Sequence, residues 1–207
     1  MSRVIRRRGT LFVVSAPSGA GKTTLCREAR LRLPDLAYSV SYTTRAPRPS
    51  EIEGTDFVFV TEAKFRSLQE RGEFAEWATV HGNLYGTRAT VLEEALREGR
   101  DVLLDIDTQG AAQLRARYPE AVLVFIVAPS LAELDQRLRE RRSDAETEIA
   151  RRLARARDEV KLWRRYDYLV VNRDLKEAAE HLTAIITAER CRTARLVLDI
   201  PDLEVPD

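Results

Sequence analysis

Short apolar runs alternate with segments of helical periodicity along most of the chain. Runs of this kind are typical of parallel strands that are covered on both faces. Four of them are Leu11–Ser15, Asp101–Asp107, Ala121–Ala128 and Tyr168–Val171. Helices fit between the runs, and one is predicted from about Thr23 to Leu33, where Pro34 ends it. This alternation predicts an α/β fold with a parallel sheet.

Three residue pairs have the spacing of a capping box, in which a side-chain oxygen accepts a hydrogen bond from the backbone three residues later. They are Thr90 with Glu93, Ser130 with Glu133, and Asp174 with Glu177. Gly99 stands where a C-cap glycine would end the first of these helices. The sequence therefore predicts helices that begin near residues 90, 130 and 174.

Two segments depart from the alternation. Residues 40–88 hold strand-like pieces at 57–60 and 74–80, a short helix near 63–71 and a Gly82-Asn83 turn, which predict a small mixed β insert. From residue 130 to about residue 159 the pattern is a charged, Arg-rich helical hairpin, which we expect to be a mobile arm. The tail after Arg195 is acidic, has two prolines, and is expected to be loose or packed on a partner.

These segments define the expected organisation of the chain. We interpret residues 1–207 as one domain with a core, an insert, a lid and a tail. The core comprises 9–39, 89–129 and 153–190, the insert 40–88, the lid 130–152 and the tail 191–207.

The composition narrows the classes of function. With 207 residues, of which 44% are hydrophobic and 32% charged, the chain can bury one globular core. Its 34 basic and 33 acidic residues give a net charge of +1, whereas proteins that grip nucleic-acid phosphates carry a large basic excess. No apolar run reaches the roughly 20 residues needed to cross a bilayer. Neither nucleic acid nor a membrane is expected as a partner, and the oligomeric state stays open.

The cysteines indicate where the protein is located, and the small number of lysines makes one of them stand out. Cys26 and Cys191 have no metal-binding spacing, and no secretory signal is recognisable, which indicates reduced thiols and a cytoplasmic location. Only four of the 34 basic residues are lysines: Lys22, Lys64, Lys161 and Lys176. A lone arginine is therefore weak evidence in this chain, and Lys22 is conspicuous.

The most specific motif follows the first predicted strand and opens the first predicted helix. It reads Ala16-Pro17-Ser18-Gly19-Ala20-Gly21-Lys22-Thr23 and matches GxxxxGK[ST], except that Ala16 replaces the first glycine. The glycines let backbone N–H groups face phosphate oxygens, Lys22 adds a charge near the β and γ phosphates, and the Thr23 hydroxyl can ligate Mg²⁺. The motif predicts a site for a nucleoside triphosphate with Mg²⁺, but leaves hydrolysis, transfer and switching open.

A pair of arginines points to a second anion site. Arg45 and Arg48 lie three residues apart in a segment that Pro47 and Pro49 stiffen. Two guanidinium groups held close together suit a dianionic phosphate, because each can bind it through two hydrogen bonds. In so Arg-rich a chain, a solvated pair of arginines is the alternative.

Nearby carboxylates favour a purine base as the rest of this ligand. Glu76 lies in a mostly apolar strand, and Asp105 and Asp107 end another strand where ligands gather at a parallel sheet. Carboxylates can accept the ring N–H and amino donors of guanine, and Ser41 or Thr87 can donate to its carbonyl oxygen. Since a buried unpaired acceptor costs about 1–3 kcal/mol, such a site discriminates between bases. Glu76 as a surface residue and Asp107 as a ligand of Mg²⁺-bound water remain alternatives.

Together these motifs resemble guanylate kinase. SAPSGAGKTT, SYTTRAPRP, EWA with GNLYGT, LDIDTQG and LVVNRD occur in the order and spacing of that family, from about Gly9 to Ala188. The resemblance implies a three-layer P-loop NTPase core, a mixed β insert that binds GMP, and a helical lid. It also implies ATP-dependent phosphorylation of GMP to GDP in purine metabolism, with Mg²⁺ as cofactor and dGMP as a further candidate acceptor.

The resemblance also implies roles for individual residues. The ATP site would comprise Ala16, Pro17, Ser18, Gly19, Ala20, Gly21, Lys22, Thr23, Thr24 and Asn172. In the GMP site, Arg45, Arg48 and Tyr85 would hold the phosphate, and Ser41, Glu76, Thr87 and Asp107 the guanine. The catalytic residues would be Lys22, Arg45, Arg137, Arg141 and Arg152. Thr23 would ligate Mg²⁺, with water supplying the other ligands.

The chain departs from the family pattern at Phe57, where a tyrosine hydroxyl usually touches the GMP phosphate. This difference predicts weaker GMP binding. Thr108 after Asp107, Arg173 after Asn172, and Arg142 where glycine is common are further departures.

No general base is expected, because a phosphate monoester with a second pKa of about 6 is mostly dianionic at neutral pH. Neither His81 nor His181 lies in a motif. Two rival functions are a kinase for another phosphorylated small molecule and a catalytically inactive protein-binding module. Glu76 and Asp107 argue against the first, and the intact Gly21-Lys22-Thr23 argues against the second.

Overall fold

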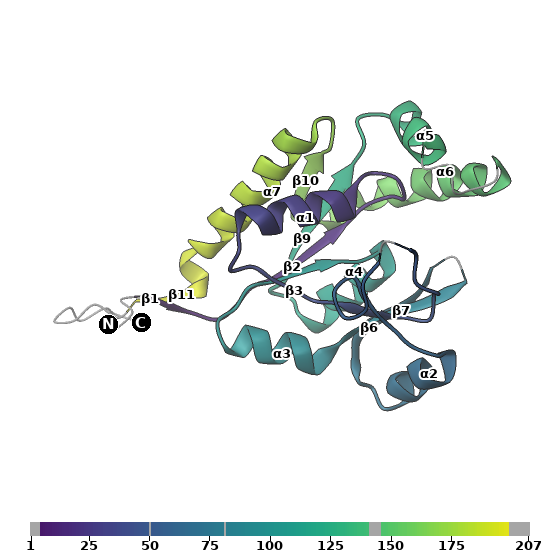
Figure 1. The fold of residues 1–207 in the computed structure, drawn as a ribbon. Helices are drawn as coiled ribbons and strands as arrows, with labels where there is room; N and C mark the ends of the chain where they lie inside the picture. Colours follow the sequence, from purple (N-terminus) through teal and green to yellow (C-terminus); the bar gives the residue numbers. More distant parts are fainter. Residues whose placement is uncertain (1–4, 50, 81, 141–145, 199–207) are drawn as a thin grey trace.

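One sheet of five parallel strands organises the computed structural model, which describes residues 5–49, 51–80, 82–140 and 146–198 (Figure 1). The strand order is β10 (Tyr168–Val171), β9 (Val122–Val127), β2 (Leu11–Ser15), β8 (Val102–Asp105) and β3 (Ala37–Tyr38). In the register, Val13 of β2 lies between Leu104 of β8 and Leu123 of β9. The four apolar runs are thus parallel strands, as predicted.

Helices cover both faces of this sheet because β2 carries apolar side chains on both. Phe12 and Val14 share one core with α1 (Lys22–Arg32) and α7 (Leu175–Arg190). Leu11 and Val13 share a second core with α3 (Ala89–Arg97) and α4 (Thr108–Arg117). Burying each such side chain contributes roughly 1.5–3 kcal/mol. The predicted α/β class is confirmed.

Residues 41–88 form a separate four-stranded mixed sheet. Its order is β5 (Phe57–Phe59), β4 (Ser41–Thr43), β7 (Asn83–Arg88) and β6 (Phe74–Val80), with α2 (Glu62–Glu70) beside it. Only the β4–β5 pair is parallel. Phe65, Leu68, Phe74 and Leu84 are the buried residues of its small core. This sheet is tied to the main core where the Gln113 amide of α4 bonds the backbone of Trp77 in β6.

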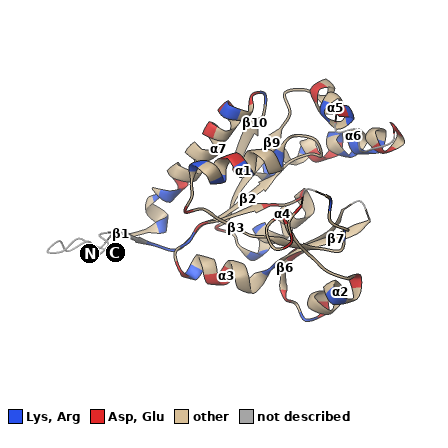
Figure 2. Ribbon diagram, in the orientation of Figure 1, with Lys and Arg blue, Asp and Glu red and all other residues tan. Residues whose placement is uncertain are grey.

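Two charged helices follow β9. They are α5 (Leu131–Glu140) and α6 (Glu146–Val160), and a short 3₁₀ helix, η1 (Lys161–Arg165), continues from α6. In Figure 2 the ribbon of both helices carries interspersed blue segments, which are basic residues, and red segments, which are acidic residues. Leu134 and Leu138 of α5 are buried and lie against Gly19, so this helix packs on the phosphate loop. Helix α6 runs unbroken through residues 152 and 153, where the lid was expected to end.

The helix starts match two of the three capping predictions. Ser130 Oγ accepts from the backbone N–H of Glu133, and Asp174 Oδ1 accepts from that of Glu177. The third helix also begins where it was predicted, at Ala89, but its predicted cap is wrong: the N-cap residue is Arg88, which makes no side-chain cap, and not Thr90. The reason is that β7 runs directly into α3 and leaves Thr90 inside the first turn.

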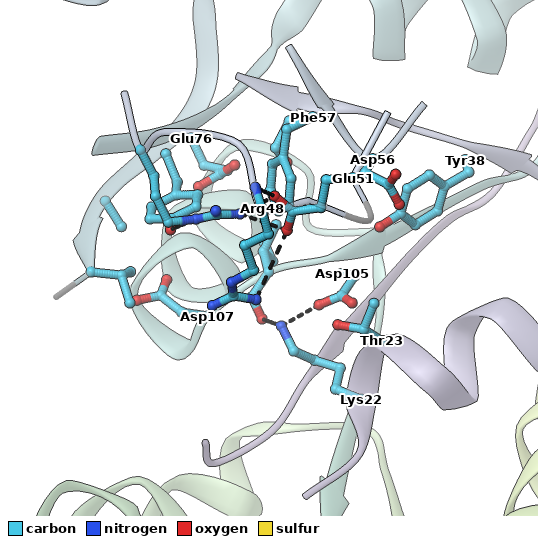
Figure 3. A pocket seen from close by; sticks show the side chains of 16 residues that line it. Lys22, Thr23, Tyr38, Arg48, Glu51, Asp56, Phe57, Glu76, Asp105 and Asp107 are labelled. Carbon is cyan, nitrogen blue, oxygen red and sulfur yellow. Dashed lines mark hydrogen bonds and ion pairs between the residues drawn. The ribbon is translucent and has the colours of Figure 1, made fainter. Parts of the chain in front are cut away.

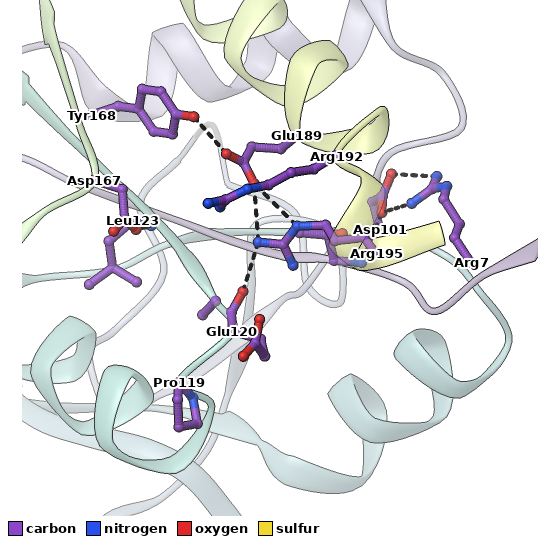
Figure 4. A network of polar contacts seen from close by, with 12 residues as sticks. Arg7, Asp101, Pro119, Glu120, Leu123, Asp167, Tyr168, Glu189, Arg192 and Arg195 are labelled. Carbon is purple, nitrogen blue, oxygen red and sulfur yellow. Dashed lines mark hydrogen bonds and ion pairs between the residues drawn. The ribbon is translucent and has the colours of Figure 1, made fainter. Parts of the chain in front are cut away.

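The two ends of the described chain pair with one another in a small antiparallel ribbon of β1 (Ile5–Arg7) and β11 (Leu196–Leu198), the latter preceded by η2 (Thr193–Arg195). The tail was expected to be loose or packed on a partner, but Leu196–Leu198 pairs with β1 of the same chain, and residues 199–207 lie outside the described part. Buried Asp101 connects the elements beside this ribbon, because its carboxylate accepts hydrogen bonds from Arg7, Arg190 and the backbone N–H of Thr10. Buried Glu189 forms a second centre that binds Tyr168 and Arg195 (Figure 4).

None of the helices in the described part of the chain has the length and apolar character that a membrane span requires.

Candidate active site

The phosphate loop turns from β2 into α1 through two glycines in the left-handed region. Gly19 has φ 91° and Gly21 has φ 87°, conformations that L side chains rarely adopt. The backbone N–H of Ala20 bonds the carbonyl of Pro17, and Lys22 is the first residue of α1. The helix N-terminus therefore faces the loop and adds roughly half a positive charge to it. This geometry is what the motif predicts.

Lys22 and Asp105 meet at the carboxyl edge of the main sheet. The Lys22 ammonium forms an ion pair with Asp105 at the end of β8 and donates to the carbonyl of Ile106 at 2.8 Å (Figure 3). The second Asp105 oxygen, Oδ2, is buried and has no hydrogen-bond partner among the described residues. Asp105 and Thr23 line the same cavity. A hydroxyl and an orphaned carboxylate oxygen are oxygen ligands of the kind that Mg²⁺ takes.

A cavity of about 280 Å³ joins the phosphate loop to the insert. Its walls come from α1, β3, β4, β5 with the loop before it, β6, β7 and the end of β8. The lining residues that were predicted for a site are Lys22, Thr23, Ser41, Arg45, Arg48, Glu76, Tyr85 and Asp107. The fold thus brings the two predicted anion sites into one cavity.

At the insert end of the cavity, Arg45 is held from several sides. Its Nε donates to the Tyr85 hydroxyl at 3.2 Å, and Nη1 donates to the carbonyl of Ala46 at 2.7 Å. Its Nη2 donates to both oxygens of Glu51, at 2.7 and 2.9 Å. Burial alone would raise the pKa of Glu51, but the bonds from Arg45 and from the Arg48 backbone hold it below its ordinary value.

Phe57 stands beside this arginine. The Arg45 guanidinium carbon lies 5.4 Å from the centre of the Phe57 ring and 5.9 Å from that of Phe59. These are cation–π distances, worth about 0.5–1 kcal/mol each at partly exposed sites. Phe57 also packs edge-on against Tyr85 and lines the cavity. Phe57 therefore packs against Arg45 and Tyr85, but it has no hydroxyl that could bind a ligand in the cavity.

Glu76 is the buried carboxylate of the cavity, with 3% of its surface exposed. Thr87 on the neighbouring strand donates to its Oε1 at 2.6 Å, and the Ser41 hydroxyl lies 3.4 Å from that of Thr87. Burial raises the pKa of Glu76 to about 7, although the hydrogen bond from Thr87 opposes the rise. Thr87 itself is fully buried behind Glu76 and does not line the cavity.

Asp107 caps α4 at the edge of the same cavity. Its Oδ1 accepts from the backbone N–H of Gly110 at 2.9 Å, and Oδ2 accepts from the Gln109 amide at 3.0 Å. Gly110 in turn lies against the Glu76 carboxylate, so that an added Cβ would overlap it. Arg155 of α6 approaches Asp107 at 3.5 Å. Asp107 therefore fixes the helix turn on which Glu76 rests.

A second cavity of about 480 Å³ lies on the other side of the phosphate loop and is lined by Gly19, Gly21, Thr24, Arg137 and Asn172, among others. The side-chain Nδ2 of Asn172 donates to the backbone carbonyl of Ala20 at 2.8 Å. The backbone carbonyl of Asn172 accepts a hydrogen bond from the Arg137 guanidinium. Arg137 and Asn172 thus hold the loop from this side. Of the predicted ATP-site residues, Gly19, Gly21, Thr24 and Asn172 line this cavity.

The predicted lid arginines are not brought to one place by the described part of the chain. Arg152 forms an ion pair with Glu148 on its own helix and lines neither cavity. Arg141 lies outside the described residues, and so does His81. His181 is exposed on α7, away from the residues that line either cavity.

Two acids of the site have positions that the sequence does not predict. The sequence groups Asp105 with the carboxylates that favour a purine base, whereas the structure places it opposite Lys22, because β8 pairs with β2. Glu51 was not singled out, although its place three residues after Arg48 is a signal for a local ion pair. Among the described residues, no three His, Cys, Asp or Glu side chains gather as a metal site by themselves.

The sequence profile of the family described as guanylate kinase matches residues 8–189 of this chain. The chain is 50% identical to the guanylate kinase of Geobacter metallireducens over 93% of its length and 95% of the relative's. It is 52% identical to that of Syntrophotalea carbinolica, covering 93% of this chain and 91% of the relative. The crystal structure of guanylate kinase from Anaplasma phagocytophilum superposes with a TM-score of 0.80 at 34% identity, covering 93% of this chain and 92% of that one.

Proposed function

The chain belongs to the guanylate kinase family and phosphorylates GMP with ATP; from this premise we propose how its residues divide the work. The observation that carries the proposal is the single cavity with Lys22 and Thr23 at one end and Arg45 and Glu76 at the other. A donor bound to the loop and an acceptor bound to the insert would meet in this cavity. Such proximity converts a bimolecular step into one within a complex.

The phosphate loop and its neighbours hold ATP in this proposal. Backbone N–H groups among residues 18–24 bind the phosphates, and Lys22 contributes its charge. Asn172 and Arg137 keep the loop in place from the side of the second cavity. Thr23 and Asp105 are the residues that would hold Mg²⁺, which supplies charge neutralisation at the transferring phosphoryl group when bound.

The insert holds GMP. Arg45, Arg48 and Tyr85 bind its phosphate, and Glu76 accepts the ring N–H and amino donors of guanine. Thr87 acts behind Glu76, because its hydroxyl orients the carboxylate. Asp107 acts in the same way through α4, although a direct contact with guanine is also open to its remaining lone pairs.

Catalysis then consists of positioning and charge stabilisation. The acceptor phosphate needs no general base, since it is mostly dianionic above its second pKa of about 6. We assign the stabilisation of charge on the transferred group to Arg137, and its position in the lining of the donor-side cavity supports this assignment. Arginines in this role contribute roughly 10³–10⁵ in rate in related phosphoryl transfers.

The test is phosphoryl transfer from Mg-ATP to a panel of acceptors, followed by ADP release. GMP should exceed AMP, CMP, UMP and dTMP in kcat/KM by roughly 10⁴, because a site built around buried hydrogen-bond partners rejects ligands that lack them. Glu76→Gln should reduce the preference for GMP, and Lys64→Gln, an exposed lysine on α2, is the matched control. A Glu76→Gln enzyme with unchanged preference would contradict the assignment of guanine recognition to this residue.

A further inference from the structure

The loop before β5 places a carboxylate between the two arginines of the phosphate site. Arg45 Nη2 donates to Glu51 Oε1 at 2.7 Å and to Oε2 at 2.9 Å. The backbone N–H of Arg48 donates to Oε2 at 2.8 Å, and Arg48 Nη1 lies 3.8 Å from Oε1. The Glu51 side chain is 12% exposed and lines the same cavity as its partners (Figure 3). A carboxylate thus occupies the centre of the site.

The donors of Arg45 are almost all committed in this arrangement. A guanidinium group has five N–H donors. Nε faces the Tyr85 hydroxyl, Nη1 faces the Ala46 carbonyl, and Nη2 faces both oxygens of Glu51. Arg45 therefore lacks a free pair of parallel donors, and a phosphate can bind it through two hydrogen bonds only if Glu51 leaves.

The charges lead to the same conclusion. Arg45 and Arg48 bring two positive charges to a partly buried site, and Glu51 balances one of them. A dianionic phosphate that joined them would face a carboxylate of the same sign at close range, a repulsion that low-dielectric surroundings strengthen. A dianion that replaced the carboxylate would leave two negative charges against two positive ones.

We propose that the Glu51 carboxylate is a resident anion that occupies the acceptor-phosphate site in the empty enzyme and is displaced by the phosphate of GMP. This inference rests on the proposed assignment of Arg45, Arg48 and Tyr85 to that phosphate. Glu51 keeps the arginines in place between turnovers and lowers the affinity of the site, so that only a ligand with a dianionic phosphate and a matching base binds well. Its return assists product release.

Glu51→Gln tests the displacement. The variant keeps a side chain that can accept from the Arg48 backbone but removes the competing charge. GMP and inorganic phosphate, measured by calorimetry without ATP, should each bind about tenfold more tightly, since a hydrogen-bonded charge no longer has to be displaced. Guanosine, which has no phosphate, should bind as before. Glu51→Ala should shift affinity in the same direction, and its melting curve checks folding.

Glu53→Gln is the matched control, because Glu53 lies two residues along the same loop and outside the cavity lining. It should leave all three affinities unchanged. If Glu51→Gln weakens GMP and phosphate binding, Glu51 only orients Arg45 and the displacement idea is overturned. A crystal structure with GMP in which Glu51 still bonds Arg45 Nη2 would overturn it equally.

Arg48→Ala separates this idea from the assignment beneath it. If that variant binds GMP and phosphate normally, the arginines are not the phosphate site and both proposals fail. If it weakens both ligands while Glu51→Gln does not strengthen them, only the resident-anion proposal fails.

Discussion

The donor end and the acceptor end of the cavity differ in the groups that would bind phosphate, which are backbone N–H groups at one end and side chains at the other. At the donor end, the phosphate loop offers backbone N–H groups from consecutive residues, held by two glycines with positive φ. At the acceptor end, side chains from β4, β6, β7 and the loop before β5 converge, and several of them already bind one another. The first site is a property of a short segment, whereas the second is a property of the packing between strands.

The two sites are therefore vulnerable to different substitutions. A backbone site fails when its conformation is disturbed, even by a small side chain. A side-chain site fails when a hydrogen-bond partner is displaced or changes its protonation state.

The largest effect is expected where the two sites must cooperate. Arg137→Ala should lower kcat by about 10³ or more while the Kd for GMP stays nearly constant, because Arg137 lines the donor-side cavity and not the acceptor cavity. Stopped-flow ADP release and calorimetry with GMP separate the two quantities. Arg139→Ala, on the exposed side of the same helix, is the control. Near-normal turnover in Arg137→Ala would refute the role.

Gly21→Ala should damage the donor end alone. Its φ of 87° strains any L side chain, and the new Cβ would come within 2.5 Å of Asn172 Nδ2. We expect the Kd for ATP to rise by about 100-fold, equivalent to about 2.7 kcal/mol, with GMP binding unchanged. Calorimetric titration with each nucleotide alone measures both. Loss of GMP affinity of the same size would show that the two ends are not independent.

Gly110→Ala is the counterpart at the acceptor end. Its Cβ would overlap the Glu76 carboxylate, although alanine otherwise favours a helix over glycine by about 0.5–1 kcal/mol. Displacing Glu76 from guanine should weaken GMP binding by roughly 10- to 100-fold, the worth of a hydrogen bond to a charged group, and spare ATP. The same pair of titrations applies. Unchanged GMP affinity would place guanine away from Glu76.

The pKa of Glu76, raised by burial to about 7, makes the acceptor end sensitive to pH. Guanine donors need the ionised carboxylate, so guanosine affinity should fall by up to about tenfold per pH unit below pH 7. Guanosine is the ligand of choice because it lacks the titrating phosphate. Glu76→Gln should abolish the dependence, and ATP affinity over the same range serves as the reference.

The raised pKa of Glu76 also makes the free energy of unfolding depend on pH. A carboxyl whose folded pKa lies above its unfolded value of 4.5 contributes stability below pH 4.5, and this contribution is lost as pH rises through 7. Chemical unfolding of the wild type and of Glu76→Gln across this range should therefore diverge.

Phe57→Tyr gives the smallest expected effect. A hydroxyl at this position would add a donor for the GMP phosphate without removing the ring that faces Arg45. We expect the KM for GMP to fall by roughly three- to tenfold with kcat unchanged. Phe59→Tyr is the control, since Phe59 also lies near Arg45 but does not line the cavity. A higher KM in Phe57→Tyr would mean that the cavity has no room for the hydroxyl.

Most strands of the main sheet and most helix starts could be predicted from local sequence patterns. The apolar runs became β2, β8, β9 and β10 because a strand covered on both faces must be apolar throughout, whatever its neighbours are. The capping prediction at Asp174 held because a cap involves residues three apart. The cap predicted at Thr90 is absent because a strand leads straight into the helix there, which no local pattern shows. Likewise, the pairing of Leu196–Leu198 with Ile5–Arg7 joins residues from opposite ends of the chain.

The phosphate loop could be predicted from the chain alone, since eight consecutive residues carry both its conformation and its donors. The burial of Glu76 against Thr87, the pairing of Asp105 with Lys22 and the position of Glu51 between two arginines became clear only from the folded structure. Burial and ion pairing depend on which strands and loops pack together. The protonation and charge balance of the acceptor end therefore follow from packing, whereas the donor end follows from a run of residues.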